Sequence, residues 1–169
     1  IFSNQTSEDI AVVNWDDDRC REISSITQAK IVPFSLKQQL AFGVFLMLDE
    51  SSQQESIVYR DSKGETQPIL PVSPLQLLGR HNIENALAVT AVSVAVKVNI
   101  SSIHEGLSLF RGVAHRQELV AEQKGVLFYN DSKATNPAAT NKAIAAFSQP
   151  IILIAGGMDR KADFSEMVP

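Results

Sequence analysis

The six residues from Asp131 to Asn136 combine a carboxylate, two hydroxyls, an ammonium group and an amide. Lys133 supplies a cation, Asp131 can accept hydrogen bonds from ribose hydroxyls, and Thr135 can hydrogen-bond a ligand. The segment stands between a predicted strand and a predicted helix, where loops of an α/β sheet face the ligand crevice. N–H groups at the helix start also suit phosphate. A capped polar loop explains the same residues equally well, so both interpretations stay open.

A second candidate segment runs His81-Asn82-Ile83-Glu84-Asn85. Asn82 and Asn85 are three residues apart, so their amides share one face of a helix. Two amides can match the donor and acceptor edge of a purine. A helix N-cap and an exposed amide explain the same pattern, and spacing alone favours that simpler interpretation. His81 by itself indicates a structural residue.

Three further segments carry charges but decide less. The carboxylates of residues 16–18 are adjacent, and adjacent residues rarely point at one ion, so we expect a solvated turn rather than a metal site. Gly156-Gly157, followed by Arg160 and Lys161, could cradle an anion through backbone N–H groups. Arg116 offers another cation. The sequence contains no G-x-x-x-x-G-K-[ST] P-loop, no G-x-G-x-x-G run and no zinc-ligand spacing.

The first part of the chain predicts strands that would position these segments. Apolar runs at 10–14 and 31–34 indicate two short strands, although Pro33 weakens the second or places it at a sheet edge. Residues 43–48 and 56–60 indicate two strands of a meander. Prolines 68, 71 and 74 exclude a helix and predict an extended crossing segment.

Residues at about 20–29 are weakly helical, and two further helices are predicted after these strands. Residues 82–98 are apolar on both faces, which predicts a central buried helix. A second helix is expected at about 102–111. Ser102 and Glu105 have the spacing of a capping box at its start, and Gly112 would follow its end.

The last part of the chain repeats the alternation of strand and helix. Residues 118–122 and 125–129 predict a hairpin with glycine in its turn. Asn136 caps a helix predicted to run to about residue 147, and an apolar strand is expected at 151–155, before the glycine pair. This order indicates an α/β fold. We place a domain boundary at residues 112–115.

Composition restricts the class of protein. The chain has 169 residues, of which 44% are hydrophobic and 20% charged, which suits one domain or parts of two. Its net charge of -4 and pI near 5.3 argue against a general nucleic-acid-binding protein.

The single cysteine, Cys20, forms no internal disulfide, so we expect the protein to lie in the cytosol. The apolar run 86–96 is too short to span a bilayer, which takes roughly 20 residues. Because the chain opens without methionine or signal sequence, we expect a piece of a longer protein.

Taken in order, these segments resemble the Mur ligases. The resemblance covers nearly the whole chain and is weakest from about 28 to 74. The residues of 131–136 favour the branch of the family that uses D-glutamate. The matching segments are N-x-D-D from Asn14, G-x-H-N-x-x-N-A-L-A from Gly79, H-R at His115, N-D-S-K-A-T-N from Asn130 and G-G-x-D-[RK] from Gly156.

The resemblance implies a fold and an activity. Residues 1–112 would form the C-terminal part of the central ATPase domain, and residues 113–169 the first part of a Rossmann-like C-terminal domain. The activity implied is the ATP-dependent addition of D-glutamate to UDP-N-acetylmuramoyl-L-alanine in peptidoglycan synthesis, through an acyl phosphate. ATP and Mg²⁺ are implied, with the P-loop and the metal ligands upstream of Ile1. We therefore expect this chain alone to be inactive.

The resemblance also implies roles for individual residues. Asn82 and Asn85 would lie at the adenine, with His81 helping to shape that site. Asp131 would hold the ribose, and Arg116 would approach the nucleotide phosphates.

The residues implied in catalysis are Lys133 and Thr135, which would face the substrate and the transferring phosphate. Arg160 matches a cation that reaches the phosphates or D-glutamate, with Lys161 as its neighbour. Two alternatives remain. One is another Mur ligase or a folylpolyglutamate synthetase, and the other is a non-catalytic nucleotide-binding module.

Overall fold

The computed structural model describes residues 2–75, 77–158 and 163–167. The chain divides into two compact units, each built from two stretches of sequence. The first unit comprises Ile1–Gln76 and Ile83–Phe110, and the second comprises Leu77–Asn82 and Arg111–Pro169.

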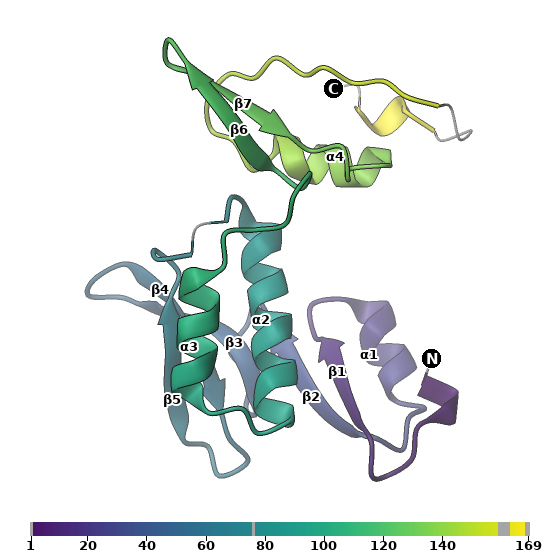
Figure 1. Ribbon diagram of the computed structural model, residues 1–169. Coiled ribbons are helices and arrows are strands. Elements are labelled where there is room, and N and C mark those ends of the chain that lie inside the picture. Colours follow the sequence, from purple (N-terminus) through teal and green to yellow (C-terminus); the bar gives the residue numbers. More distant parts are fainter. Residues whose placement is uncertain (1, 76, 159–162, 168–169) are drawn as a thin grey trace. The chain divides into compact units, whose positions relative to one another are not determined.

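The first unit is built on one five-stranded sheet, ordered β1-β2-β3-β4-β5 (Figure 1). β1, β2 and β3 run parallel to one another, and β4 and β5 continue the sheet as an antiparallel meander. This mixture of parallel strands and helices confirms the predicted α/β class. The strands are β1 (Ile10–Asn14), β2 (Lys30–Ser35), β3 (Gly43–Asp49), β4 (Gln54–Arg60) and β5 (Thr66–Pro71), and the helices are η1 (Phe2–Asn4), α1 (Asp18–Ser24), α2 (Arg80–Ala95) and α3 (Ile100–Leu109).

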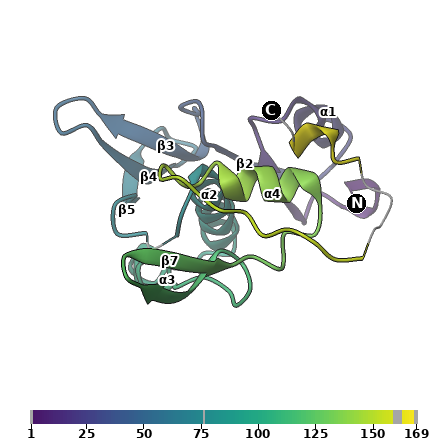
Figure 2. The same cartoon turned by 90° about the horizontal axis from the view of Figure 1, so that it is seen from above.

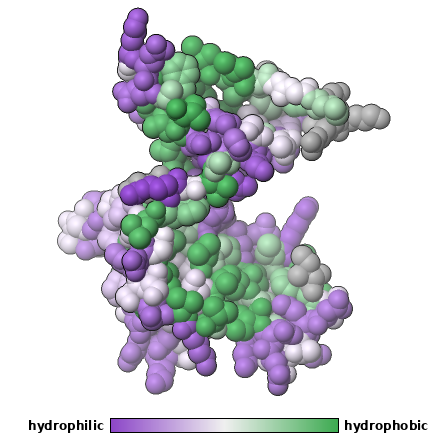
Figure 3. Space-filling model, in the orientation of Figure 1, coloured by the Kyte–Doolittle hydropathy of each residue, from purple (hydrophilic) through white to green (hydrophobic). Residues whose placement is uncertain are grey.

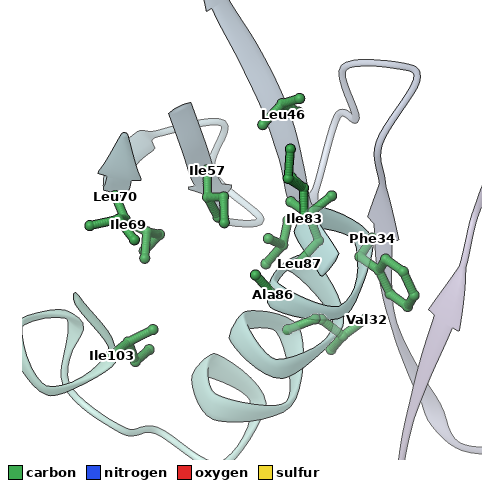
Figure 4. Close-up of a cluster of buried hydrophobic side chains, with 12 residues drawn as sticks. Val32, Phe34, Leu46, Ile57, Ile69, Leu70, Ile83, Ala86, Leu87 and Ile103 are labelled. Atoms are coloured by element: carbon green, nitrogen blue, oxygen red, sulfur yellow. The ribbon is translucent and has the colours of Figure 1, made fainter. Parts of the chain in front are cut away.

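Alternating residues send the strands' side chains to two different cores. Val12 and Val32 pack with α2 and α3 in the main core, and Ala11 and Val13 pack with Cys20 of α1 in a smaller one. In the main core, side chains from the sheet meet those of α2 (Figure 4). The main core is formed by Val32, Phe34, Val44, Leu46, Ile57, Ile69, Leu70, Ile83, Ala86, Leu87, Ala91 and Ile103.

α2 buries only one of its two apolar faces, so the expectation of a helix buried all round was wrong. Leu87 is fully buried, whereas Val89 and Val92 are 54% and 49% exposed, and Val96, just after the helix, is 65% exposed. Green apolar spheres gather on the side of this unit seen in Figure 3. The exposed valines lie opposite the sheet, and the described residues of this unit form no second layer over them. No helix among the described residues is long and apolar enough to cross a membrane.

Pro33 lies in an inner strand, which corrects the prediction of an edge. β2 is bonded to β1 on one side and β3 on the other. The proline is tolerated because the β2–β3 ladder includes only Phe34 and Ser35 of β2, so the missing N–H falls outside it. Gly43 at the start of β3 has φ +116, and a Cβ there would lie 2.3 Å from the Pro33 carbonyl oxygen.

β5 is a regular strand where the prolines predicted only an extended crossing segment. It pairs antiparallel with β4, with Val58 opposite Pro68 and Ser56 opposite Pro71. The register shifts between Ile57 and Val58, and β5 lies at the end of the strand order. An edge strand accepts proline because one of its sides needs no N–H donors, and an irregular register accepts it as well.

Helix starts are set by capping residues, two of which differ from expectation. α1 begins after Asp17, whose side chain accepts from the backbone N–H of Cys20, so the helix starts and ends earlier than the predicted 20–29. α3 is capped by Asn99, which accepts from the N–H of Ser102. The predicted capping box at Ser102 was therefore wrong. Asn99, an asparagine in the extended conformation three residues before Ser102, occupies the N-cap position instead.

The Asp17 cap predicts a pH dependence of stability. The N–H of Cys20 holds the pKa of the Asp17 carboxyl below its ordinary value of 3.8. Its contribution to stability is thus present above pH 3.8 and is lost as the pH falls through the lowered pKa.

Asp17→Asn keeps a capping oxygen but removes this titration. We expect Asp17→Asn to unfold in urea as the wild type does at neutral pH, and to lose less stability on acidification. The fluorescence of Trp15, the single tryptophan, measures both curves. Equal acid sensitivity of the two proteins would contradict the assignment.

The second unit contains a hairpin followed by a helix. β6 (Glu118–Gln123) and β7 (Val126–Asn130) pair antiparallel, as predicted, around Lys124 and Gly125, whose φ values are 51° and 79°. Two positive φ values are typical of a type I′ turn. α4 (Pro137–Ile144) begins with Pro137 behind an Asn136 cap, which confirms the prediction, although it ends before residue 147. The rings of Tyr129 and Phe147 pack edge to face, with their centroids 4.8 Å apart.

Residues 151–155 form no strand in the described part of the chain, so that prediction was wrong for this structure. Figure 2 shows the stretch as extended coil, and Ile152 and Ile154 are 95% and 94% exposed. A strand requires a bonded neighbour, and the two-stranded sheet of this unit contains only β6 and β7. A short 3-10 helix, η2 (Ser165–Met167), follows and contacts α4.

Candidate nucleotide site

The Asp131–Asn136 loop joins the end of β7 to the start of α4, as the sequence predicted. It is shaped by its own hydrogen bonds. The N–H of Ala134 donates to the Asp131 carbonyl at 2.9 Å, and that of Ser132 donates to Asn130 Oδ1 at 3.1 Å. Asn136 Oδ1 accepts from the N–H of Ala139 at 2.8 Å. The side chains of Lys133 and Thr135 are left exposed at the helix N-terminus.

The segment before β6 lies directly against this loop. The backbone N–H of Lys133 donates to the His115 carbonyl at 3.0 Å, and the N–H of Gln117 donates to Asp131 Oδ1 at 3.1 Å. His115 and Gln117 have positive φ values of 67° and 46°. A left-handed backbone conformation costs free energy for residues that have a Cβ. Residues strained in this way are often found at functional sites.

Gln117 connects three parts of the second unit, and sequence reasoning missed it. Its Oε1 accepts from Asn82 Nδ2 at 3.3 Å, and its Nε2 donates to the Ala143 carbonyl at 3.2 Å. Asn82 Nδ2 also donates to the Leu78 carbonyl at 2.7 Å, and Asn82 is 8% exposed. Two predicted site residues, Asn82 and Asp131, are therefore both bonded to Gln117. No local pattern marks Gln117, because its partners are distant in sequence.

His115 and Arg116 occupy the turn before β6. Asn130 Nδ2 lies 2.8 Å from His115 Nδ1, and the His115 N–H donates to Glu118 Oε2 at 2.8 Å. The backbone N–H of Arg116 donates to the Val113 carbonyl at 3.1 Å, while its side chain is exposed. This turn therefore holds its backbone in place and presents the Arg116 guanidinium to solvent.

The N-x-D-D segment lies in the first unit, at the carboxyl end of β1. Asn14 Nδ2 donates to Glu84 Oε1 of α2 at 2.7 Å. Asp16 accepts from Ser35 Oγ at 2.6 Å and from the Leu36 N–H at 2.6 Å. Asp17 caps α1, and Asp18 pairs with Arg21 of the same helix. The three carboxylates are thus engaged by different partners.

The remaining predicted residues fall in different places. Asn85 is exposed on α2 in the first unit, and His81 is half-buried in the second. Arg160 and Lys161 lie outside the described residues. The described residues include no group of three or more His, Cys, Asp or Glu side chains able to hold a metal ion. A hollow of about 420 Å³ contains none of the predicted residues and is lined by Ser52, Gln53, Gln54, Glu55, Val72 and Ser73.

Comparison with known families covers most of the chain. The model of the Mur ligase middle domain matches residues 1–93, and that of the Mur ligase glutamate ligase domain matches residues 115–169.

The chain belongs to the Mur ligase family.

Relatives in the Mur ligase family align with this chain over nearly its whole length. The UDP-N-acetylmuramoylalanine–D-glutamate ligase of Desulfitobacterium hafniense (strain DSM 10664 / DCB-2) is 42% identical over 168 residues, which are 99% of this chain and 36% of that protein. The ligase of the same name from Ligilactobacillus salivarius (strain UCC118) is 41% identical over 169 residues, which are 100% of this chain and 34% of that protein. The chain thus spans about a third of the length of these relatives.

Two solved structures share the fold of this chain. MurF from Acinetobacter baumannii superimposes with a TM-score of 0.57 and 24% identity, covering 79% of this chain and 28% of that one. Folylpolyglutamate synthetase from Lactobacillus casei gives a TM-score of 0.51 and 21% identity, covering 87% of this chain and 37% of that one. Identities at this level show the fold alone.

Proposed function

We propose that the chain is part of an ATP-dependent ligase that adds D-glutamate to UDP-N-acetylmuramoyl-L-alanine through an acyl phosphate, in cytoplasmic peptidoglycan synthesis. The observation that carries this proposal is the Asp131–Asn136 loop, which presents Lys133 and Thr135 at a capped helix start. Relatives matched over 99% of the chain carry the name of that ligase. We further propose that residues 1–112 belong to the central domain and residues 113–169 to the C-terminal domain.

Asp131 and Lys133 suit complementary roles in binding the nucleotide. One carboxylate oxygen of Asp131 accepts from Gln117, which orients the group and leaves its other oxygen for a ribose hydroxyl. The backbone N–H of Lys133 donates to the His115 carbonyl, which fixes the backbone from which the exposed side chain of Lys133 extends. Phosphoryl transfer depends mainly on positioning and on stabilising charge at the transferring group. Lys133 would supply that charge, with Thr135 as a hydrogen-bond donor.

The other predicted residues would bind the rest of ATP. Asn85 is exposed, and its carboxamide can pair with a purine edge. Asn82 is buried, with its Nδ2 donating to Leu78 and Gln117, so it would support that region from beneath, and His81 would shape it. Arg116 is exposed and can reach a phosphate oxygen. Arg160 is proposed for the phosphates or D-glutamate from its place in the sequence alone.

Mg²⁺ is expected with ATP, but the adjacent carboxylates of residues 16–18 do not fit it. Those of residues 16–18 are engaged separately by Ser35 and backbone N–H groups, by the start of α1 and by Arg21. Hard divalent cations require several oxygen ligands around one point. No step is therefore assigned to a metal held by this segment.

The proposal is tested on the full-length protein. We expect ADP release only when ATP, UDP-N-acetylmuramoyl-L-alanine and D-glutamate are all present, and no release when L-glutamate or a folate replaces its counterpart. Release with the folate would instead indicate a folylpolyglutamate synthetase.

The 169-residue chain provides a second test. Because it contains no P-loop sequence, we expect it to release no ADP with the same three substrates. Titration calorimetry with ATP then separates a nucleotide-binding segment from a purely structural one. ADP release by this chain that depends on all three substrates would contradict its expected inactivity.

A further inference from the structure

Asn14 forms a tertiary hydrogen bond between residues that are 70 positions apart in sequence. It is the last residue of β1, and its Nδ2 donates to Glu84 Oε1 on α2 at 2.7 Å. Its Oδ1 accepts from the N–H of Asp16 at 3.0 Å. The amide is therefore oriented by its own loop, with the donor turned toward α2.

The strand end that carries Asn14 is itself firmly held. The N–H of Trp15 donates to the Phe34 carbonyl at 2.8 Å. Asp16 accepts from Ser35 Oγ and from the N–H groups of Leu36 and Lys37, at 2.6, 2.6 and 3.2 Å. These bonds join the carboxyl ends of β1 and β2. Asn14 thus offers α2 a fixed donor rather than a mobile one.

Apolar packing alone leaves a helix some freedom to rotate and slide. Ile83, Ala86 and Leu87 hold α2 to the sheet through non-directional contacts. The hydrogen bond at Glu84 is directional, so it fixes the rotation of the helix at that turn. Asn85 follows Glu84 in the helix and is exposed, about 100° further around its axis. A small rotation of α2 would turn the Asn85 amide away from a ligand.

We propose that Asn14 and Glu84 are positioning residues that orient Asn85 toward the adenine of ATP. This inference rests on the proposed function. The two side chains act through α2 rather than by touching the nucleotide. Asn14 is the residue of the N-x-D-D segment to which the proposed chemistry gives no other task, and Glu84 lies on α2 directly before Asn85.

The test compares ATP with inosine triphosphate as substrates of the full-length ligase. Inosine lacks the exocyclic amine that an asparagine amide reads, so the ratio of kcat/KM for the two nucleotides reports on Asn85. Asn14→Leu removes the donor at similar volume. We expect this ratio to fall by roughly tenfold, with KM for D-glutamate unchanged. Glu84→Gln retains an acceptor oxygen and is expected to keep the wild-type ratio.

Two comparisons distinguish positioning from general damage. Thr66→Val removes the Arg60 Nε–Thr66 Oγ1 hydrogen bond of 2.8 Å elsewhere in the same sheet, and should leave the ratio unchanged. In the Asn14→Leu/Glu84→Leu double variant, the loss should be no greater than in Asn14→Leu, because both changes remove one bond. An active wild type whose ratio survives Asn14→Leu, even with a lower Tm, overturns the positioning role. A wild type that forms no ADP overturns the proposed function itself.

Discussion

Lys133→Ala in the full-length ligase is expected to lower kcat by roughly 10²–10³-fold, the range found when one preorganised charge-stabilising group is removed. The loss should fall mainly on kcat rather than on KM for ATP, because the ammonium group matters most as charge develops on the transferring phosphate. Steady-state ADP release at varied ATP measures both constants.

Lys142→Ala is the matched control. Lys142 lies in the last turn of α4, whereas Lys133 precedes the start of that helix. Both changes remove one positive charge from the same unit, so a general electrostatic effect would appear in both. Lys133→Arg keeps the charge but changes its shape, and should recover part of kcat. Equal kcat in the Lys133→Ala and Lys142→Ala variants would remove Lys133 from the catalytic machinery.

Gly43→Ala is expected to destabilise the first unit by about 3–5 kcal/mol. The added Cβ would lie 2.3 Å from the Pro33 carbonyl oxygen and 2.9 Å from Pro33 Cγ. Gly43 also has φ +116, which an L side chain rarely adopts. Both costs fall on the junction of β2 and β3 in the middle of the sheet. Urea unfolding followed by Trp15 fluorescence gives the free energy, because Trp15 packs against the sheet beside Phe45.

Two other glycines separate the contributions. Gly64 has φ +87 with open space around it, so Gly64→Ala isolates the backbone cost, about 1–2 kcal/mol. Gly106 lies inside α3 with open space, so Gly106→Ala should stabilise by about 0.5–1 kcal/mol. If Gly43→Ala costs no more than Gly64→Ala, the close approach to Pro33 is not the decisive effect.

Local signals predicted the elements whose cause is local. The hairpin around Lys124-Gly125 and the Asn136 cap before Pro137 follow from the conformations these residues favour. β1 and β3 follow from apolar runs of strand length. The Asp131–Asn136 loop could likewise be located between a strand and a helix. The roles of Lys133 and Asp131 stay predictions until they are measured.

Features that depend on distant partners could not be predicted in the same way. The prolines of β5 argued against a strand in the sequence. Only the pairing with β4 shows that β5 lies at an edge, where missing N–H groups cost little stability. Gln117 carries no signal in its neighbours, and its importance arises from contacts with Asn82, Asp131 and Ala143. The hydrophobicity of α2 suggested full burial, but composition does not say how many layers surround a helix.

The second unit takes one of its two stretches, Leu77–Asn82, from the sequence before α3, and this limits where the chain can be divided. A piece beginning at Arg111 would lose Asn82, the donor to Gln117 Oε1. It would also lose Gly79, which packs so closely on Ala146 that an added Cβ would lie 2.7 Å from the alanine Cβ. A cut between residues 82 and 83 would interrupt α2 after its third residue. The two units are therefore not modules that can be exchanged at a linker, and recombination between relatives should keep residues 77–82 and 111–169 from the same parent.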